Sequence, residues 1–167
     1  MIALAAALTL GTHTIPVYEI YKVGADPSWL PGLDLLGPAT GLQAAVVPHF
    51  DNAEGGNHDT RFCYMGERRL RILERELTPG TFILGVDSHT ALVLDLDRRT
   101  ATVSGLGGVT VRVEGGSTVF PSGSEVSIDT LADVAHGLAE GHAVDIGWEP
   151  GRDGAGRLAP GGGQASR

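Results

Sequence analysis

His49 is the residue of this chain whose position most directly suggests chemistry. The preceding residues 44–47 are small or β-branched, which predicts a short buried strand. Pro48 has no N–H to donate to a sheet, so the strand should end there and present His49 just beyond it. Open α/β sheets place ligands and reacting groups at the carboxyl ends of strands, which makes His49 a candidate general base. A histidine bonded to a backbone carbonyl is the structural alternative.

A second predicted strand ends in polar residues as well. Residues 81–86 are rich in β-forming side chains and lead into Asp87 and Ser88. If the two strands are parallel neighbours, His49 and Ser88 should face one crevice. Serine hydrolysis needs a nucleophilic hydroxyl, a histidine within hydrogen-bond reach and a carboxylate that orients the histidine.

The helices and strands that the sequence predicts around these residues indicate an α/β fold. The expected fold is part of a doubly wound, mainly parallel sheet with flanking helices and a C-terminal β-hairpin region. Helices are predicted from apolar stripes, and further strands from β-branched runs between turn residues. The predicted helices span 1–8, 61–77 and 128–139, and the further strands span 90–96, 100–103, 108–113 and 117–120.

Three segments resemble, in order, the second half of the peptidase E and cyanophycinase family. They are Pro48-His49-Phe50, the helix over 61–77, and the run from Gly85 to Val93. The resemblance covers roughly residues 1 to 125 and implies a class I glutamine amidotransferase-like fold with serine peptidase activity of the S51 type. It also implies that His49 is the general base. Residues 1–146 would then be the C-terminal portion of the hydrolase domain, and the Gly/Pro-rich residues 147–167 a disordered tail.

The nucleophile of that family is a serine in a Gly-x-Ser-Ala-Gly-Ala turn between a strand and a helix, where its hydroxyl is exposed. This sequence contains no such turn, and residues 1–8 resemble the helix that follows it. We therefore expect a truncated chain that lacks its nucleophile. A secretory signal is the alternative for residues 1–8, but no basic residue precedes this apolar stretch.

The sequence leaves open which group orients His49. In the cyanophycinase branch it is a glutamate directly after the aspartate of a Gly-x-Asp-Glu-x-Thr-Ala motif, and Ser88 stands at that position here. Asp87, one residue earlier, would point to the opposite face of a continuing strand. In the peptidase E branch an aspartate in the connector after the nucleophile helix has this role, but neither Glu19 nor Asp26 aligns with it. His49, Ser88 and Asp87 are therefore the catalytic candidates.

The loop over 51–59 resembles a loop of peptidase E, so Asn52 and His58 are candidates for substrate contact. A loop stabilised by Asx turns is the equal alternative.

Metal binding is the competing chemistry, because this region offers nitrogen and oxygen ligands. The sequence has no His-Glu-x-x-His spacing, so we expect no metal and no other cofactor. The possible ligands are His49, Asp51, His58, Asp59 and His89.

The composition of the chain limits the kinds of partner that it is expected to bind. The net charge of −8 argues against a nucleic-acid partner. The one cysteine, Cys63, permits no internal disulfide and falls on a predicted helix, where a buried, inert thiol is favoured. The apolar stretch over residues 1–8 is too short to span a bilayer, and we expect no membrane partner and a cytoplasmic location. A homodimer is left open.

These observations predict a serine-type peptidase-like hydrolase that acts on amide or peptide bonds. Its substrate would be a small peptide or an aspartyl-containing compound. A noncatalytic remnant or binding subunit of the same fold is the alternative function.

Overall fold

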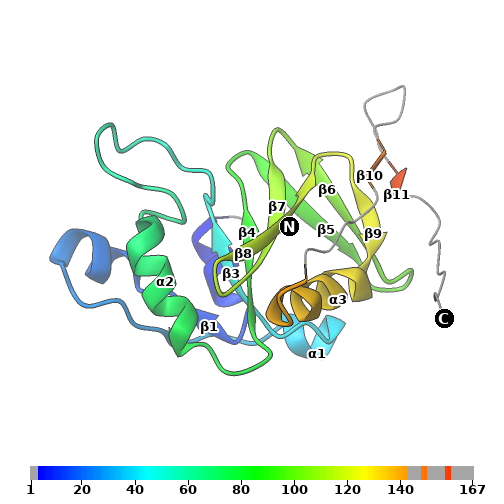
Figure 1. Cartoon of the computed structure of the whole chain (residues 1–167), viewed down its shortest axis with the longest axis horizontal. Helices are drawn as coiled ribbons and strands as arrows, with labels where there is room; N and C mark the ends of the chain where they lie inside the picture. The colour runs from blue at the N-terminus through cyan, green and yellow to red at the C-terminus, as the bar shows by residue number, and fades with distance from the viewer. Residues whose placement is uncertain (1–3, 143–147, 150–156, 159–167) are drawn as a thin grey trace.

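The computed structural model describes residues 4–142, 148–149 and 157–158. Its main sheet has four strands in the order β3-β4-β7-β8 (Figure 1). The two strands predicted to carry the site, β3 and β4, are parallel, whereas β7 and β8 are antiparallel to their neighbours. The α/β class is confirmed, but the expected mainly parallel sheet is found only in part, because β3–β4 is the one parallel pairing of the described main sheet and its other two pairings are antiparallel. The strands span Ala44–Pro48, Phe82–Val86, Gly108–Val113 and Gly116–Pro121.

The antiparallel part of the sheet follows from the connections. A tight turn joins β7 to β8, and both of its residues, Glu114 and Gly115, have positive φ angles. Two-residue turns of this kind match the twist of an antiparallel hairpin. Before β7, the chain forms a second hairpin, β5 (Thr90–Asp95) with β6 (Thr100–Gly105), and returns antiparallel to β4. The predicted β-hairpin region is therefore present.

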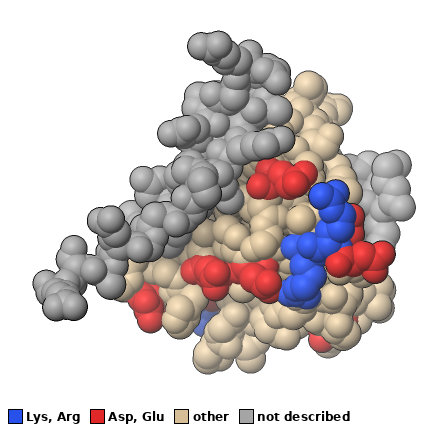
Figure 2. All heavy atoms as spheres, turned by 90° about the vertical axis from the view of Figure 1, so that its right-hand side faces the viewer, with Lys and Arg blue, Asp and Glu red and all other residues tan. Residues whose placement is uncertain are grey.

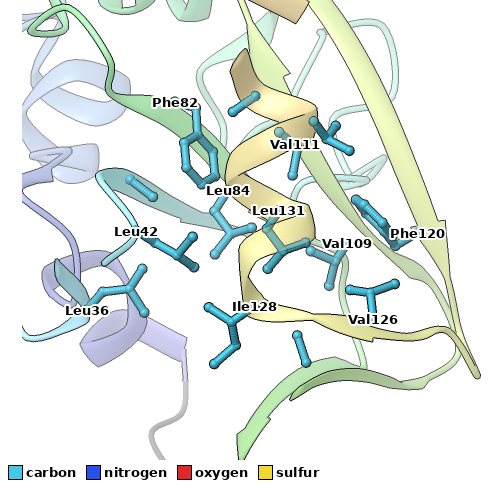
Figure 3. Packing of buried hydrophobic residues seen from close by; sticks show 14 of the residues in the cluster. Leu36, Leu42, Phe82, Leu84, Val109, Val111, Phe120, Val126, Ile128 and Leu131 are labelled. Carbon is cyan, nitrogen blue, oxygen red and sulfur yellow. The ribbon is translucent and has the colours of Figure 1, made fainter. Parts of the chain in front are cut away.

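The hairpin strands and the short strand β9 (Glu125–Ser127) form a second sheet, in the order β5-β6-β9. Helix α3 (Ile128–Ala139) has the predicted bounds, and the hydroxyl oxygen of Ser127 caps it by accepting the N–H of Thr130 at 3.1 Å. Its apolar face packs into a core built from both sheets (Figure 3). That core includes Leu84, Val103, Val109, Val111, Phe120, Val126, Leu131 and Val134.

Helix α2 (Gly66–Glu76) packs on the other face of the main sheet. Alternation along the two parallel strands explains how both faces are covered. Val46 and Leu84 contribute to the core around α3, whereas Val47 and Ile83 pack with apolar residues of α2. All five residues of β3 are buried, as expected for a parallel strand covered on both sides. This arrangement fixes the register of β3 and β4, and with it the place where each strand ends.

The N-terminal prediction was wrong in part. Among the described residues, the expected helix over 1–8 is a short 3-10 helix, Leu4–Thr9, in which Ala6 is exposed and Ala7 to Thr9 are half-buried. Ala7 packs against the core around α3, and Leu8 packs against the apolar residues around α2. The connector that follows holds β1 and β2, a π-helical turn and the short helix α1. Their bounds are His13–Thr14, Leu30–Pro31, Glu19–Val23 and Leu36–Thr40.

Most of the predicted tail lies outside the described residues. Within it, β10 (Trp148–Glu149) and β11 (Arg157–Leu158) form a short antiparallel pair, and the disorder of the remainder stays a prediction. None of the helices in the described part of the chain has the length and apolar character needed to cross a membrane. Figure 2 shows a compact group of basic side chains bordered by acidic ones on one face of the molecule.

Candidate active site

The candidate site lies where β3 and β4 end side by side (Figure 1). The two strands are parallel, and the last residue of one, Pro48, is in register with the last residue of the other, Val86. The chain segments that follow therefore begin at the same edge of the sheet. His49 follows β3, and Asp87 and Ser88 follow β4, as the sequence predicts.

The Nδ1 atom of His49 and the Oγ atom of Ser88 are 3.2 Å apart and form a hydrogen bond. Both residues are half-buried. Either atom can be the donor, because the role of Nδ1 depends on the tautomer of the imidazole. His49 and Ser88, which the sequence predicts to lie close together, are thus in contact in the structure. Their catalytic roles remain predictions.

Glycine at position 85 allows the aromatic residue beside His49 to lie against the sheet. The ring of Phe50 covers Gly85 so closely that a Cβ atom there would lie 2.5 Å from the ring. Phe50 also packs against Phe62, with the two rings tilted by 60° and their centroids 4.5 Å apart, and it donates its backbone N–H to the carbonyl of Val86. These contacts hold the start of the His49 loop on the end of β4.

A left-handed turn supports His49 from the other side, and here the predicted helix over 61–77 needs correction. Phe62, Cys63 and Tyr64 have φ angles of 60°, 54° and 68°, and α2 begins only at Gly66. The turn donates two backbone N–H groups to the His49 loop, from Phe62 to the carbonyl of Phe50 and from Cys63 to that of His49. His49 itself has a φ angle of 50°. Tertiary hydrogen bonds thus stabilise a backbone conformation that these residues otherwise disfavour.

Cys63 lies in this left-handed turn and not on a helix. Its side chain is buried, and burial raises the pKa of the thiol to about 11. A thiol with a raised pKa holds little thiolate at neutral pH, so it is a poor nucleophile. The predicted burial of this thiol is confirmed, and its inertness stays a prediction.

The turn that carries Ser88 is fixed by three further hydrogen bonds. The backbone N–H of Ser88 donates to Oδ1 of Asp51 at 2.7 Å, and the carbonyl of Ser88 accepts the hydroxyl of Thr90 at 3.1 Å. The hydroxyl of Thr90 in turn accepts the N–H of Gly107 at 2.9 Å. The role of Asp51 was missed in the sequence, where it entered only as a possible metal ligand. Its position two residues after His49 was the available signal.

Asp87 is directed toward the turn before β7. Its Oδ2 accepts the backbone N–H of Gly108 at 2.7 Å, and the described hydrogen bonds include none between Asp87 and His49. Burial raises the pKa of Asp87, the hydrogen bond from Gly108 opposes this change, and the nearby charge of Asp51 adds to it. Asp87 therefore stabilises the turn, and its catalytic role stays a prediction.

The two candidates for substrate contact differ in their surroundings. Asn52 is buried, and its Oδ1 accepts the backbone N–H of Glu54 at 3.0 Å, which is the Asx turn of the structural alternative. His58 is exposed, and its backbone N–H donates to the carbonyl of Gly55. Neither side chain has a hydrogen bond to His49 or Ser88 among those of the described residues, so substrate contact remains untested.

The possible metal ligands do not converge. Among residues 4–142 and the two short described segments beyond them, no three His, Cys, Asp or Glu side chains lie close enough to hold a metal ion. Asp59 instead forms a bidentate pair with Arg61 and accepts the N–H of Glu67 at the start of α2. These contacts hold the pKa of Asp59 far below its usual range, chiefly through the hydrogen bond from Arg61.

Two cavities of about 390 and 410 Å³ lie elsewhere in the described structure. The first is lined by residues that include Glu74, Arg112 and His136, and the second by residues near the start of α2. Neither includes His49 or Ser88. The candidate site is therefore defined by its strand ends and its hydrogen bonds.

Comparison with known proteins leaves the family open. No family model matches the chain, and no curated protein matches it. One similar solved structure is the crystal structure of a peptidase from an acI-B1 Actinobacterium, with 19% sequence identity and a TM-score of 0.49. The match covers 72% of this chain and 42% of that one, so the chain spans less than half the length of that peptidase. A likeness of this size assigns neither a family nor an activity to this chain.

Proposed function

We propose that this chain carries the histidine part of a serine-hydrolase site that acts on amide or peptide bonds. The observation that supports the proposal is the hydrogen bond between Nδ1 of His49 and Oγ of Ser88, at the ends of two neighbouring parallel strands. Ser88 stands at the position where the cyanophycinase branch, which the sequence resembles, has the glutamate that orients its histidine. A partner at Nδ1 leaves Nε2 as the ring atom that can face a nucleophile.

The chemistry of such a site follows from the two ring nitrogens. With a proton on Nδ1, the unprotonated Nε2 can take the proton of a serine hydroxyl as that oxygen attacks the substrate carbonyl. The same nitrogen then returns the proton to the leaving amine. Ser88 keeps the ring in the orientation that these transfers need. The substrate is a small peptide or an aspartyl-containing compound, as the resemblance implies.

Ser88 is the orienting group in this proposal and not the nucleophile. A nucleophile elbow needs a strand, a sharp turn and a helix, whose N-terminal N–H groups help to stabilise the oxyanion. Ser88 follows a strand, but the next element is the strand β5. The printed sequence also has no Gly-x-Ser-Ala-Gly-Ala. These 167 residues are therefore expected to hydrolyse no peptide by themselves.

The second candidate function is a noncatalytic binding module of the same fold. In this alternative, a peptide would bind at the sheet edge where β3 and β4 end, without being cleaved. The coding sequence upstream of Met1 separates the two candidates. An in-frame Gly-x-Ser-Ala-Gly-Ala there would favour the enzyme, and a stop codon directly upstream would favour the binding module.

If that turn is present, the protein extended through it should hydrolyse small peptides, aspartyl dipeptides among them. His49→Ala should then lower kcat/KM on the order of 10²- to 10⁴-fold, the usual contribution of a positioned general base. Hydrolysis by the extended protein that His49→Ala leaves unchanged would refute the proposed role of His49.

A further inference from the structure

The site has a hydroxyl group where an orienting carboxylate is expected. Which ring nitrogen of His49 carries the proton therefore depends on whether this hydroxyl donates or accepts. A carboxylate can only accept from Nδ1–H, so it holds a histidine in the tautomer whose Nε2 is free. A serine hydroxyl can accept from Nδ1–H or donate to an unprotonated Nδ1. If Ser88 donated, the ring proton would lie on Nε2, and His49 could not act as a base there.

Asp51 is a carboxylate that directly contacts Ser88. Its Oδ1 accepts the backbone N–H of Ser88 at 2.7 Å, so a carboxylate oxygen lies beside the residue whose hydroxyl contacts His49. Asp51 is on the His49 loop, two residues after the histidine, and reaches across to the turn after β4. None of the ion pairs among the described residues involves Asp51, so no cation of that region offsets its charge by direct contact.

The other carboxylate near the site is engaged elsewhere. Asp87 accepts the N–H of Gly108, on the side of β7. The charge of Asp51 also contributes to the raised pKa of Asp87, the residue before Ser88, after the larger effect of burial. Asp51 is thus placed to influence the polar groups of Ser88.

We propose that Asp51 supplies, through Ser88, the negative charge that fixes the ring proton of His49 on Nδ1. The carboxylate attracts the positive end of the Ser88 hydroxyl dipole, which leaves the lone pairs of Oγ to accept from Nδ1–H. Nε2 is then unprotonated. Asp51 is a positioning residue in this arrangement, because it acts on His49 through Ser88. This inference rests on the proposed function, since a free Nε2 matters only if His49 acts as a base.

The test is ¹⁵N NMR of the 167-residue chain with labelled histidine rings, at a pH where His49 is neutral. The chain has six histidines, and the spectrum of His49→Gln assigns the signals of His49. The wild-type protein should show the proton of His49 on Nδ1. Asp51→Asn keeps an oxygen that can accept the Ser88 N–H but removes the charge, so it should lose the preference for Nδ1–H. Adding Ser88→Glu to that variant places a carboxylate directly beside the ring and should restore the preference.

Asp95→Asn is the matched control. Asp95 also accepts a backbone N–H, from Arg98 at 2.9 Å, but it lies at the turn of the β5–β6 hairpin. This control should leave the His49 tautomer unchanged.

A wild-type ring protonated on Nε2 would overturn the proposal, even if no variant folds. An Asp51→Asn protein with the wild-type tautomer would overturn it as well. These measurements read a proton position and need no hydrolysis, so they are independent of the activity assay. An extended protein whose hydrolysis does not depend on His49 would refute the proposed function and leave the tautomer result standing.

Discussion

The ring of Phe50 lies directly over Gly85, and a methyl group at position 85 would meet three ring atoms at 2.5 to 2.8 Å. Phe50 is buried and packs against the ring of Phe62, so its ring has little room to move away. We predict that Gly85→Ala lowers the free energy of unfolding by about 1–3 kcal/mol, the usual cost of overpacking a core. Because His49 precedes Phe50, the backbone NMR signals of His49 should shift in the same variant.

Gly116→Ala is the control for this substitution. Gly116 also lies in a strand, and a Cβ there would come no closer than 3.3 Å to its neighbours. Urea denaturation of both variants gives the comparison. Equal stability of Gly85→Ala and the wild-type protein would show that the Phe50 ring is not confined.

Leu131 is central to the core between the two sheets. It is 1% exposed and projects from α3 among side chains of both sheets (Figure 3). Leu131→Ala should lower the free energy of unfolding by about 2–5 kcal/mol, through lost burial and the cavity left behind. Leu106→Ala removes the same atoms from a side chain that is 85% exposed, and should change stability by no more than about 0.5 kcal/mol. Similar losses in both variants would contradict this packing.

The sequence predicts best the positions of His49 and Ser88, because each follows the end of a strand. The apolar runs before His49 and Ser88 predict two buried strands, and parallel pairing then places both residues at one edge of the sheet. The helix over 128–139 was predicted with its observed bounds, because its stripe of apolar residues matches the face that it buries. The spacing of apolar residues along the local sequence is sufficient to predict elements of this kind.

Features that depend on distant contacts were not predictable in this way. Phe62 fits the apolar stripe of a helix that begins at residue 61, but it lies in a left-handed turn whose N–H groups bind the His49 loop. The three-residue strand β9 is too short to show alternation. The hydrogen bond from Ser88 to Asp51 joins residues 37 positions apart and depends on the tertiary fold. Each of these is determined by long-range pairing.

An ion-pair network between α2 and β7 predicts how stability changes in acid. Arg112 donates to both Glu67 and Glu74, and its hydrogen bonds lower the pKa of Glu67 to about 2, from an ordinary value of 4.5. A carboxyl whose pKa is lowered by folding stabilises the protein above its unfolded pKa and loses that contribution as the pH falls toward its folded pKa. Unfolding free energy should therefore decrease between about pH 4.5 and pH 2.

Glu67→Gln tests this prediction by removing the titrating group. Its unfolding free energy should depend less on pH over the same range, because the unfolded state no longer gains a proton at this residue. Asp59 has a pKa lowered in the same direction and will keep part of the dependence in the variant. Urea denaturation at several pH values provides the measurement, and identical slopes for the variant and the wild-type protein would contradict the assignment to Glu67.

Fluorophosphonate labelling of the 167-residue chain, read by intact mass and peptide mapping, tests most directly whether Ser88 orients His49 or attacks the substrate. A serine peptidase labelled in parallel verifies the reagent, and aspartyl dipeptides provide the matching hydrolysis assay. We predict no adduct on Ser88 and no turnover, since the chain has no elbow around this serine. An adduct that maps to Ser88, disappears in His49→Ala and accompanies peptide hydrolysis would contradict this account and identify Ser88 as the nucleophile.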